Sequence, residues 1–250
     1  MKTVKKIIFE LLPLLVLLGI LGGIQAAIQF YKIPKYVLPS PFAALRYIFV
    51  NLNVMLPHIW KSVLQFLIGF PLGALIGVTF ALIFTVNKVL NKAVSPYLMI
   101  IICTPQLVMV PLLKMWMGFG VMVCVVAGAL SCFGIIMMNT MAGVSMVPVE
   151  RIELMQSFKA NKWQTFYKVI IPSSLPSVFT GLKLGCIFSL TGIIGAEMIG
   201  DLRGMGAMIV IATDLYSMEE MFAYIFLLMF FAYIFYSGIC AFESRLVKEE

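Results

Sequence analysis

Long apolar stretches alternate with short polar ones along most of this 250-residue chain. A transmembrane helix needs about 20 mostly apolar residues, because in lipid every backbone N–H and C=O must be satisfied inside the helix. Six stretches meet this length and are predicted to span a membrane: 7–30, 58–84, 94–113, 119–142, 177–199 and 220–242. They fill the chain, so residues 1–250 are predicted to form a single all-α transmembrane domain.

The first of these stretches has an alternative interpretation. Lys2, Lys5 and Lys6 precede its apolar run, as the basic residues of a secretory signal peptide do. The segment GGIQAAIQF lacks a convincing small-x-small cleavage site, and the apolar run continues to Phe30. A retained helix is therefore the favoured interpretation over a removed signal peptide.

The composition supports a membrane protein. Hydrophobic residues make up 62% of the chain and charged residues 12%, whereas a soluble domain has about 45–50% and roughly 25%. So few charges cannot coat a soluble domain of this size. The chain is therefore predicted to be a multi-pass protein of the cell (inner or cytoplasmic) membrane.

Lys and Arg predict the orientation, since they favour the cytoplasmic side of a membrane. With a cytoplasmic amino terminus, twelve of the 18 fall on that side and six outside: Lys32, Lys35, Arg46, Lys61, Lys114 and Arg203. Both termini are therefore predicted to be cytoplasmic. Orientation and anionic lipid headgroups account for the net charge of +7 without a nucleic-acid partner.

Residues for a catalytic or metal site are scarce. The five cysteines all fall within predicted spans, none in a CxxC pair, and are interpreted as small packing residues. His58 has no metal-ligand partner near it in sequence. No GxxxxGK[ST] motif or Ser/His/Asp constellation occurs. We therefore expect no metal, no catalytic residue, no bound cofactor and no ATP hydrolysis by this chain.

The stretch 150–181, ERIELMQSFKANKWQTFYKVIIPSSLPSVFTG, is a polar and basic island between the fourth and fifth spans. Its pattern predicts two short helices. Pro148 suits the first turn of one, and an apolar stripe follows at Ile152, Met155 and Phe158. Asn161 is a good N-cap for the second, with Gln164 three residues later as in a capping box.

Pro172 and Pro176 are expected to end this second helix before the fifth span. The predicted orientation places the island in the cytoplasm. An amphipathic loop lying on the membrane surface and a helix that docks in a groove of a partner protein fit the pattern equally well.

The island resembles the cytoplasmic loop of importer-type ABC transporter permeases. That family's signature is Glu-Ala-Ala, three residues, Gly, nine residues, then Ile-x-Leu-Pro. Here Glu153 is followed at the same spacing by Lys159 and then by Val169-x-Ile171-Pro172. The resemblance implies an ATPase-coupling loop at about 143–176, made of Glu150, Arg151, Glu153, Leu154, Met155, Phe158, Lys159, Ala160, Asn161 and Trp163, with Val169, Ile171 and Pro172 at its end.

Lys159 stands where the family has glycine. A glycine there would allow a left-handed helix end, which a lysine adopts at a cost of ~1 kcal/mol or more. Either the turn forms around Asn161, which tolerates that conformation, or the loop is strained at Lys159.

Three further segments extend the resemblance to the nitrate, sulfonate and taurine branch of these permeases: VLPSPFAALRYI at 37–48, TPQLVMVPLLKMWMGFG at 104–120 and GAEMIGDLRGMGAMIV at 195–210. The resemblance implies a type I ABC importer permease fold and two copies forming one pathway. It also implies a cytoplasmic ATPase that binds ATP and Mg²⁺, and an extracytoplasmic substrate-binding protein. The solute would be an organosulfonate, a nitrate-like oxyanion or a thiamine-precursor pyrimidine.

Polar residues within the predicted spans are candidates for the translocation path, because burying them in lipid is costly. They are Gln106, Ser189, Thr191 and Glu197. Glu197 has a competing interpretation as a carboxylate at the water interface that pairs with Arg203. Lys114 and Trp116 are interpreted as interface anchors.

Small residues at Gly69, Gly73 and Gly77 would let another helix approach closely. That helix could belong to this chain, which we favour, or to a second copy. Two other function classes stay open: an ATP-independent secondary transporter or channel, although no internal repeat is visible, and a membrane scaffold with a basic docking loop.

Overall fold

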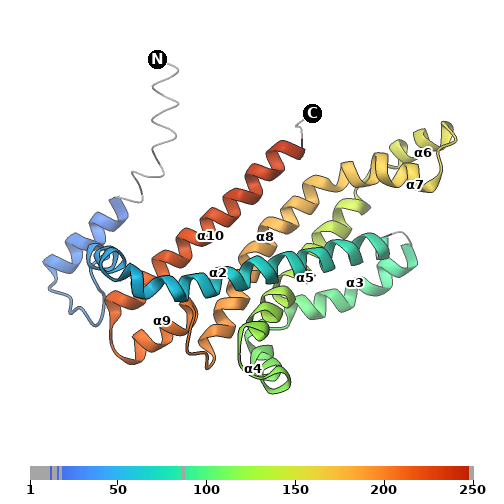
Figure 1. Ribbon diagram of the computed structural model, residues 1–250. Helices are drawn as coiled ribbons and strands as arrows, with labels where there is room; N and C mark the ends of the chain where they lie inside the picture. The colour runs from blue at the N-terminus through green and yellow to red at the C-terminus, as the bar shows by residue number, and fades with distance from the viewer. Residues whose placement is uncertain (1–11, 13–15, 17–18, 86–87, 248–250) are drawn as a thin grey trace, which may run out of the picture.

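The computed structural model describes residues 12, 16, 19–85 and 88–247, and within them it is built of helices without strands (Figure 1). A short helix at Gly19–Phe30 precedes the labelled elements. Those are α2 (Pro41–Thr85), α3 (Lys88–Cys103), α4 (Gln106–Met117), α5 (Val121–Ser145), α6 (Val149–Ser157), α7 (Lys162–Thr165), the π-helix η1 (Phe166–Ile170), α8 (Ile171–Met198), α9 (Met205–Asp214) and α10 (Met218–Leu246).

Four helical stretches of the described chain are long and apolar enough to cross a membrane: α2, α5, the continuous stretch Lys162–Met198, and α10. They contain the predicted spans 58–84 and 220–242, and they contain 119–142 and 177–199 except for the first two residues of the former and the last residue of the latter. The predicted span 7–30 is described only in part: its second half is helical at Gly19–Phe30, whereas 7–11, 13–15 and 17–18 lie outside the described residues. The all-α membrane fold is confirmed, whereas the count of six and the cytoplasmic termini stay predictions.

The predicted span 94–113 is wrong as a single helix. The chain breaks at Thr104–Pro105, and the helices on either side are bent by 88° (Figure 1). Pro105 has no N–H to donate, and its ring disfavours helical backbone at the preceding residue. Apolar length alone did not reveal this, because the residues on both sides of the break are mostly hydrophobic.

Helix α2 begins at Pro41, well before the predicted start at residue 58, and runs for 45 residues. At 1.5 Å per residue it is ~67 Å long, about twice the hydrocarbon thickness of a bilayer. Pro41 is favourable at a first helical position, but Arg46, Asn51 and Asn53 interrupt the apolar pattern of the first turns. Hydropathy therefore predicts a start that is too late in the sequence for this helix.

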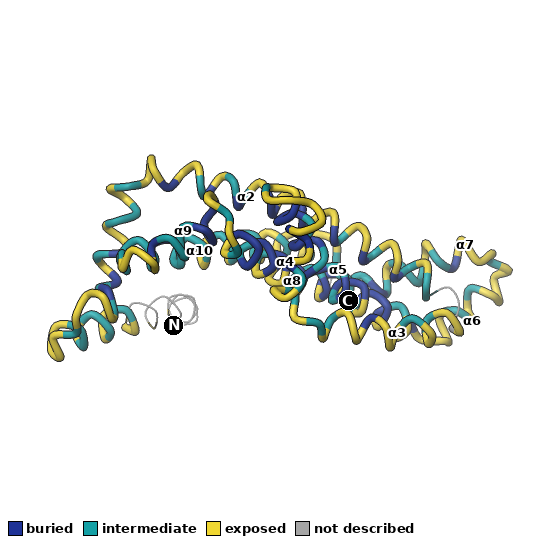
Figure 2. The backbone as a smooth tube through the Cα atoms, turned by 90° about the horizontal axis from the view of Figure 1, so that it is seen from below, coloured by how far each residue is buried: buried dark blue, intermediate teal, exposed yellow. Residues whose placement is uncertain are grey.

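Helix α5 is the centre of the packing, with α2 on one side and α8 on the other. In its most apolar part 61% of residues are buried, whereas none are in the corresponding part of α10. Figure 2 shows the buried residues gathered where α5 and α8 lie together, with exposed residues dominating both ends.

The three glycines of α2 face the backbone of α5. A Cβ at Gly69 would lie 2.8 Å from the carbonyl oxygen of Val125, one at Gly73 would lie 2.6 Å from that of Ala129, and one at Gly77 would lie 2.7 Å from that of Phe133. Successive glycines of α2 face successive α5 residues that are four positions apart. In this structure the three glycines therefore lie at a helix contact within the chain.

We expect Gly73→Ala to destabilise the protein by about 1–3 kcal/mol or more, because the new methyl group overlaps the α5 backbone. The matched control is Gly238→Ala in α10, where nothing lies within 4 Å of the added Cβ. Alanine is the better helix former by roughly 0.8–1.0 kcal/mol, so the control should be neutral or stabilising. Thermal unfolding in detergent measures both, and equal midpoints would contradict the packing described here.

Candidate functional site

The island folds as the two short helices that its pattern predicts, at the far end of the molecule from α9 (Figure 1). Pro148 is the N-cap of α6. Both bonds of the capping box are present at α7: Asn161 Oδ1 accepts from the Gln164 backbone N at 2.8 Å, and Gln164 Oε1 accepts from the Asn161 N at 2.9 Å. The local prediction is therefore confirmed down to its hydrogen bonds.

The turn between the helices is left-handed at Lys159, with φ +54°, whereas Asn161 has an ordinary φ of −77°. Ala160 N donates to Met155 O at 3.0 Å and Lys159 N to Gln156 O at 2.8 Å. These two bonds are those of a Schellman motif, whose first residue after the helix is usually glycine. Of the two alternatives, the loop thus takes the strained one, at ~1–2 kcal/mol for a lysine.

The second helix does not end at Pro172, which corrects the sequence prediction. Instead η1 follows α7 directly, and Pro172 lies in the first turn of α8 with Ile171. A π-turn is one way in which a helix accommodates a gap in its hydrogen-bond ladder. The loop is therefore joined to α8 by continuous helix rather than by a flexible linker.

Most of the predicted coupling residues fall into two groups, and Ala160 and Ile171 are half-buried and belong to neither. One group lines a groove of about 720 Å³ between α6, η1, the start of α8 and the end of α10: Arg151, Leu154, Met155, Val169 and Pro172, together with Lys168 and Leu246. Arg151 Nη1 also donates to Ser173 Oγ at 3.3 Å. A second group is exposed around the loop: Glu150, Glu153, Phe158, Lys159, Asn161 and Trp163.

Large apolar side chains are exposed on this loop, since no residue of α6 is buried. Phe158 is 75% exposed and Trp163 69%. The Trp163 ring stacks on that of Tyr167, which is also exposed, with centroids 6.1 Å apart. Clustered exposed apolar groups mark an interaction surface, so the geometry favours a docking element.

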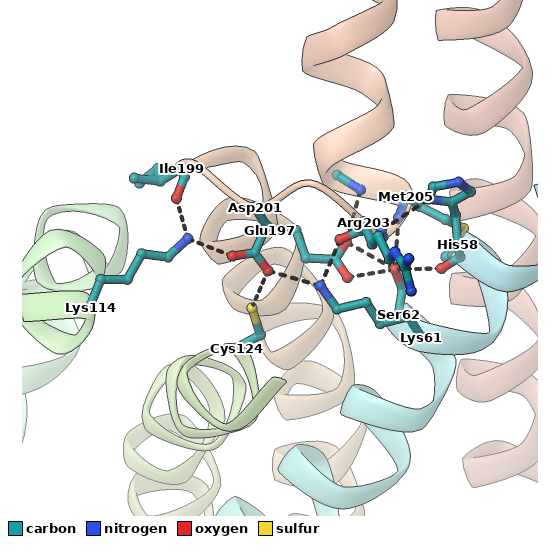
Figure 3. A network of polar contacts seen from close by, with 12 residues as sticks. His58, Lys61, Ser62, Lys114, Cys124, Glu197, Ile199, Asp201, Arg203 and Met205 are labelled. Carbon is teal, nitrogen blue, oxygen red and sulfur yellow. Dashed lines mark hydrogen bonds and ion pairs between the residues drawn. The ribbon is translucent and has the colours of Figure 1, made fainter. Parts of the chain in front are cut away.

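At the opposite end of the molecule lies a buried polar network around Glu197 and Asp201 (Figure 3). Glu197 is 0% exposed. Its carboxylate accepts from Ser62 Oγ of α2 at 2.7 and 2.9 Å and from the Gly206 N of α9 at 2.8 Å. Glu197 thus satisfies an N–H in the first turn of α9, where negative charge is favourable. It is not the water-exposed partner of Arg203 that the sequence suggested.

Asp201 lies between two lysines of different helices. Its Oδ2 is 3.0 Å from Lys61 Nζ of α2, and its Oδ1 is 3.0 Å from Lys114 Nζ of α4. Cys124 Sγ of α5 lies 3.5 Å from Oδ2. Lys114 also donates to Ile199 O and lies over the Phe119 ring. Lys114 is therefore a buried ion-pair partner and not the interface anchor expected from the sequence.

Burial alone would raise the pKa of the Asp201 carboxyl, but hydrogen bonds from Lys114 and Lys61 outweigh it and lower that pKa. A carboxyl with a lowered folded-state pKa stabilises the protein fully above its ordinary value of about 4. This contribution is lost only as the pH falls through the lowered value. The contact therefore persists throughout the neutral range.

The other three candidates for the translocation path differ in burial and in hydrogen bonding. Gln106 is partly buried at the break between α3 and α4, and its Nε2 donates to Thr104 O at 3.4 Å. Ser189 is fully buried, and its Oγ has no hydrogen-bond partner among the described residues. Thr191 is exposed and donates back to Ile187 O at 3.0 Å. Their roles, and that of Glu197 in transport, stay predictions.

We expect Asp201→Ala to destabilise the protein by about 3–5 kcal/mol, because it leaves Lys114 buried and unpaired. The Asp201 and Lys114 side chains are 3% and 4% exposed. The control is Glu219→Ala, since Glu219 pairs at 3.8 Å with a Lys35 side chain that is 88% exposed. Such surface pairs contribute about 0–1 kcal/mol. Chemical or thermal unfolding measures the stability of both variants. A similar loss of stability in both would contradict the stabilising role of the Asp201 network.

Known proteins are similar to this chain in sequence and in fold. The chain is 25% identical over 231 residues to a probable ABC transporter permease protein of Haemophilus influenzae, covering 92% of this chain and 94% of the relative. It is 29% identical over 180 residues to the taurine transport system permease protein TauC of Escherichia coli, covering 72% and 62%. The fold is similar to a chain of the inward-facing MetNI methionine ABC transporter, with a TM-score of 0.70 at 17% identity, covering 79% and 98%.

The family profile of the "binding-protein-dependent transport system inner membrane component" matches residues 69–248. This range contains the glycines that pack on α5, the island, and Lys114, Glu197 and Asp201 of the buried network, whose Lys61 and Ser62 precede it. The resemblance seen in the sequence is confirmed: the chain belongs to this family and is a permease subunit of an ABC transporter in the cell membrane, not itself an enzyme.

Proposed function

We propose that this chain forms the translocation pathway of an ATP-driven importer and receives its drive through the loop 150–172. Transport systems of this family work with an ATPase and a substrate-binding protein. The observation that carries the proposal is the exposed two-helix loop with the permease spacing at Glu153, Lys159 and Pro172. ATP and Mg²⁺ would be bound by the partner ATPase.

The position of the loop suits mechanical coupling. It follows α5 and leads by continuous helix into α8, and these two helices pack closely on one another. A displacement of α6 would therefore move α5 and α8 together. Nucleotide can drive this change only if the ATPase binds the two states of the joint with different affinity.

The proposed solute is a small organosulfonate, a nitrate-like oxyanion or a thiamine-precursor pyrimidine. The relative named for taurine supports the first class. Among the path candidates, Gln106 is favoured as a solute contact because it lies at the break between α3 and α4. Broken helices in transporters leave backbone groups available to solutes. We propose that two copies of the chain face one another across this path.

The test is purification of the tagged chain from its native membrane, with mass spectrometry of the proteins that stay bound. We expect a stoichiometric ABC ATPase. The purified complex, reconstituted in vesicles with its substrate-binding protein, should take up labelled taurine or another of these solutes only with ATP. A chain that purifies alone and transports without ATP would overturn the proposal in favour of a secondary transporter.

We expect Glu153→Arg to leave membrane insertion intact and to weaken ATPase association by about tenfold or more. Glu153 is exposed on α6, and a reversed charge at an interface costs several kcal/mol when it meets a like charge. Arginine forms helix as well as glutamate does, so α6 should persist. The control is Asp214→Arg, the same charge change on an exposed residue at the other end of the molecule. Normal ATP-stimulated uptake by the Glu153 variant would argue against the coupling role.

A further inference from the structure

The inference concerns Lys159, whose backbone is left-handed with φ +54°. The bonds from Ala160 N to Met155 O and from Lys159 N to Gln156 O hold it in that conformation. Glycine adopts this backbone without strain, and a lysine does not. Strained residues that the surrounding structure over-determines cluster at functional sites. Since the backbone would be better served by glycine, the reason for lysine must lie in its side chain.

The Lys159 side chain has no polar partner in the part of the chain that the structure describes. The residue is exposed, and no hydrogen bond or ion pair joins its ammonium group to any residue that the structure describes. Its neighbours at the tip are the exposed rings of Phe158 and Trp163 and a second exposed lysine, Lys162. The tip is therefore an apolar surface with cations at its edge.

The charges of the loop are ordered along α6. Glu150 and Glu153 are exposed on its first two turns, Arg151 between them lines the groove and donates to Ser173 Oγ, and Lys159 follows the last turn. A surface that receives this helix must therefore be complementary to negative charge at one end and to positive charge at the other. Such a pattern fixes the direction in which the helix lies and rejects surfaces with the wrong order of charges.

We propose that Lys159 is a specificity-determining residue for the ATPase: it pairs with an Asp or Glu at the edge of the ATPase surface that accepts α6 and α7. This inference rests on the proposed function, because it requires the loop to be the docking element. The pair lies at the rim of the contact, so it governs partner choice and the rate of association more than the total affinity.

A protein partner is favoured over lipid headgroups by the position of the tip. Along the direction of α8, α6 and α7 reach well beyond the cytoplasmic ends of α2 and α10 (Figure 1). Basic and aromatic side chains that anchor in headgroups lie at the level where spans leave the membrane. The tip lies past that level, where an aqueous partner can surround it.

The experiment titrates the ATPase that co-purifies with the wild-type chain onto the chain in nanodiscs of zwitterionic phosphatidylcholine and, in parallel, in nanodiscs that contain anionic lipid. Lys159→Gly removes the side chain while relieving the turn, so a weaker complex cannot be blamed on a damaged loop. Lys159→Arg keeps the charge. Lys92→Gln is the control, because Lys92 is an exposed lysine of α3 whose loss changes the net charge equally.

We expect Lys159→Gly to raise the Kd roughly two- to fivefold at low salt, as for an exposed ion pair. The difference from wild type should vanish at 0.5 M salt, since screening removes such attractions. Lys159→Arg and Lys92→Gln should bind as wild type does. A Lys159→Gly chain with unchanged Kd, or a loss seen only in anionic nanodiscs, would overturn the inference while leaving the coupling loop intact. Failure of the wild-type chain to bind any ATPase would overturn both.

Discussion

The close approach of helix backbones onto α5 is the constraint on which the rest of the structure depends. Between helices in lipid there is no hydrophobic driving force, so association rests on van der Waals contact. Glycines of α2 meet one side of α5, and glycines of α8 meet another: a Cβ at Gly181 would lie 3.2 Å from Ile136 O, and one at Gly192 would lie 3.0 Å from Ala127 O. Once α2 and α8 are set on α5, the positions of both ends of the molecule follow.

At the end away from the loop, this packing brings α2 beside the end of α8, so that Ser62 meets Glu197 and Lys61 meets Asp201 (Figure 3). At the other end it leaves α6 and α7 projecting from the two best-packed helices. The polar chemistry of the chain is thus separated into a closed network, which joins helices to one another, and an open loop, whose side chains are largely exposed. The proposed function assigns ATPase binding to the open loop.

Sequence patterns predicted the structural features that depend on residues close together in the sequence. Apolar length located α5, α8 and α10, four-residue spacing located the glycine face, and the Asn161–Gln164 pair located the start of α7. They failed where the deciding partner is distant: Asp201 is 140 residues from Lys61 and 87 from Lys114. Without that partner both lysines look like ordinary loop cations. The short helix α9 was also missed, because its apolar run is too short to span and its stabilising carboxylate comes from α8.

The Asp201 network explains how a broken span can still have one position. After the 88° bend, α4 does not continue the line of α3, and apolar contacts in lipid would let it slide along α8 at little cost. A buried ion pair adds little net stability compared with apolar packing, but it has one geometry and a large penalty for losing it. Lys114 donates to both Ile199 O and Asp201, so a shift of α4 by one turn would leave a buried lysine unpaired and Asp201 with Lys61 alone. The register of α4 on the bundle is therefore fixed by the free-energy cost of the shifted, unpaired arrangement. The net stability of the ion pair itself contributes less.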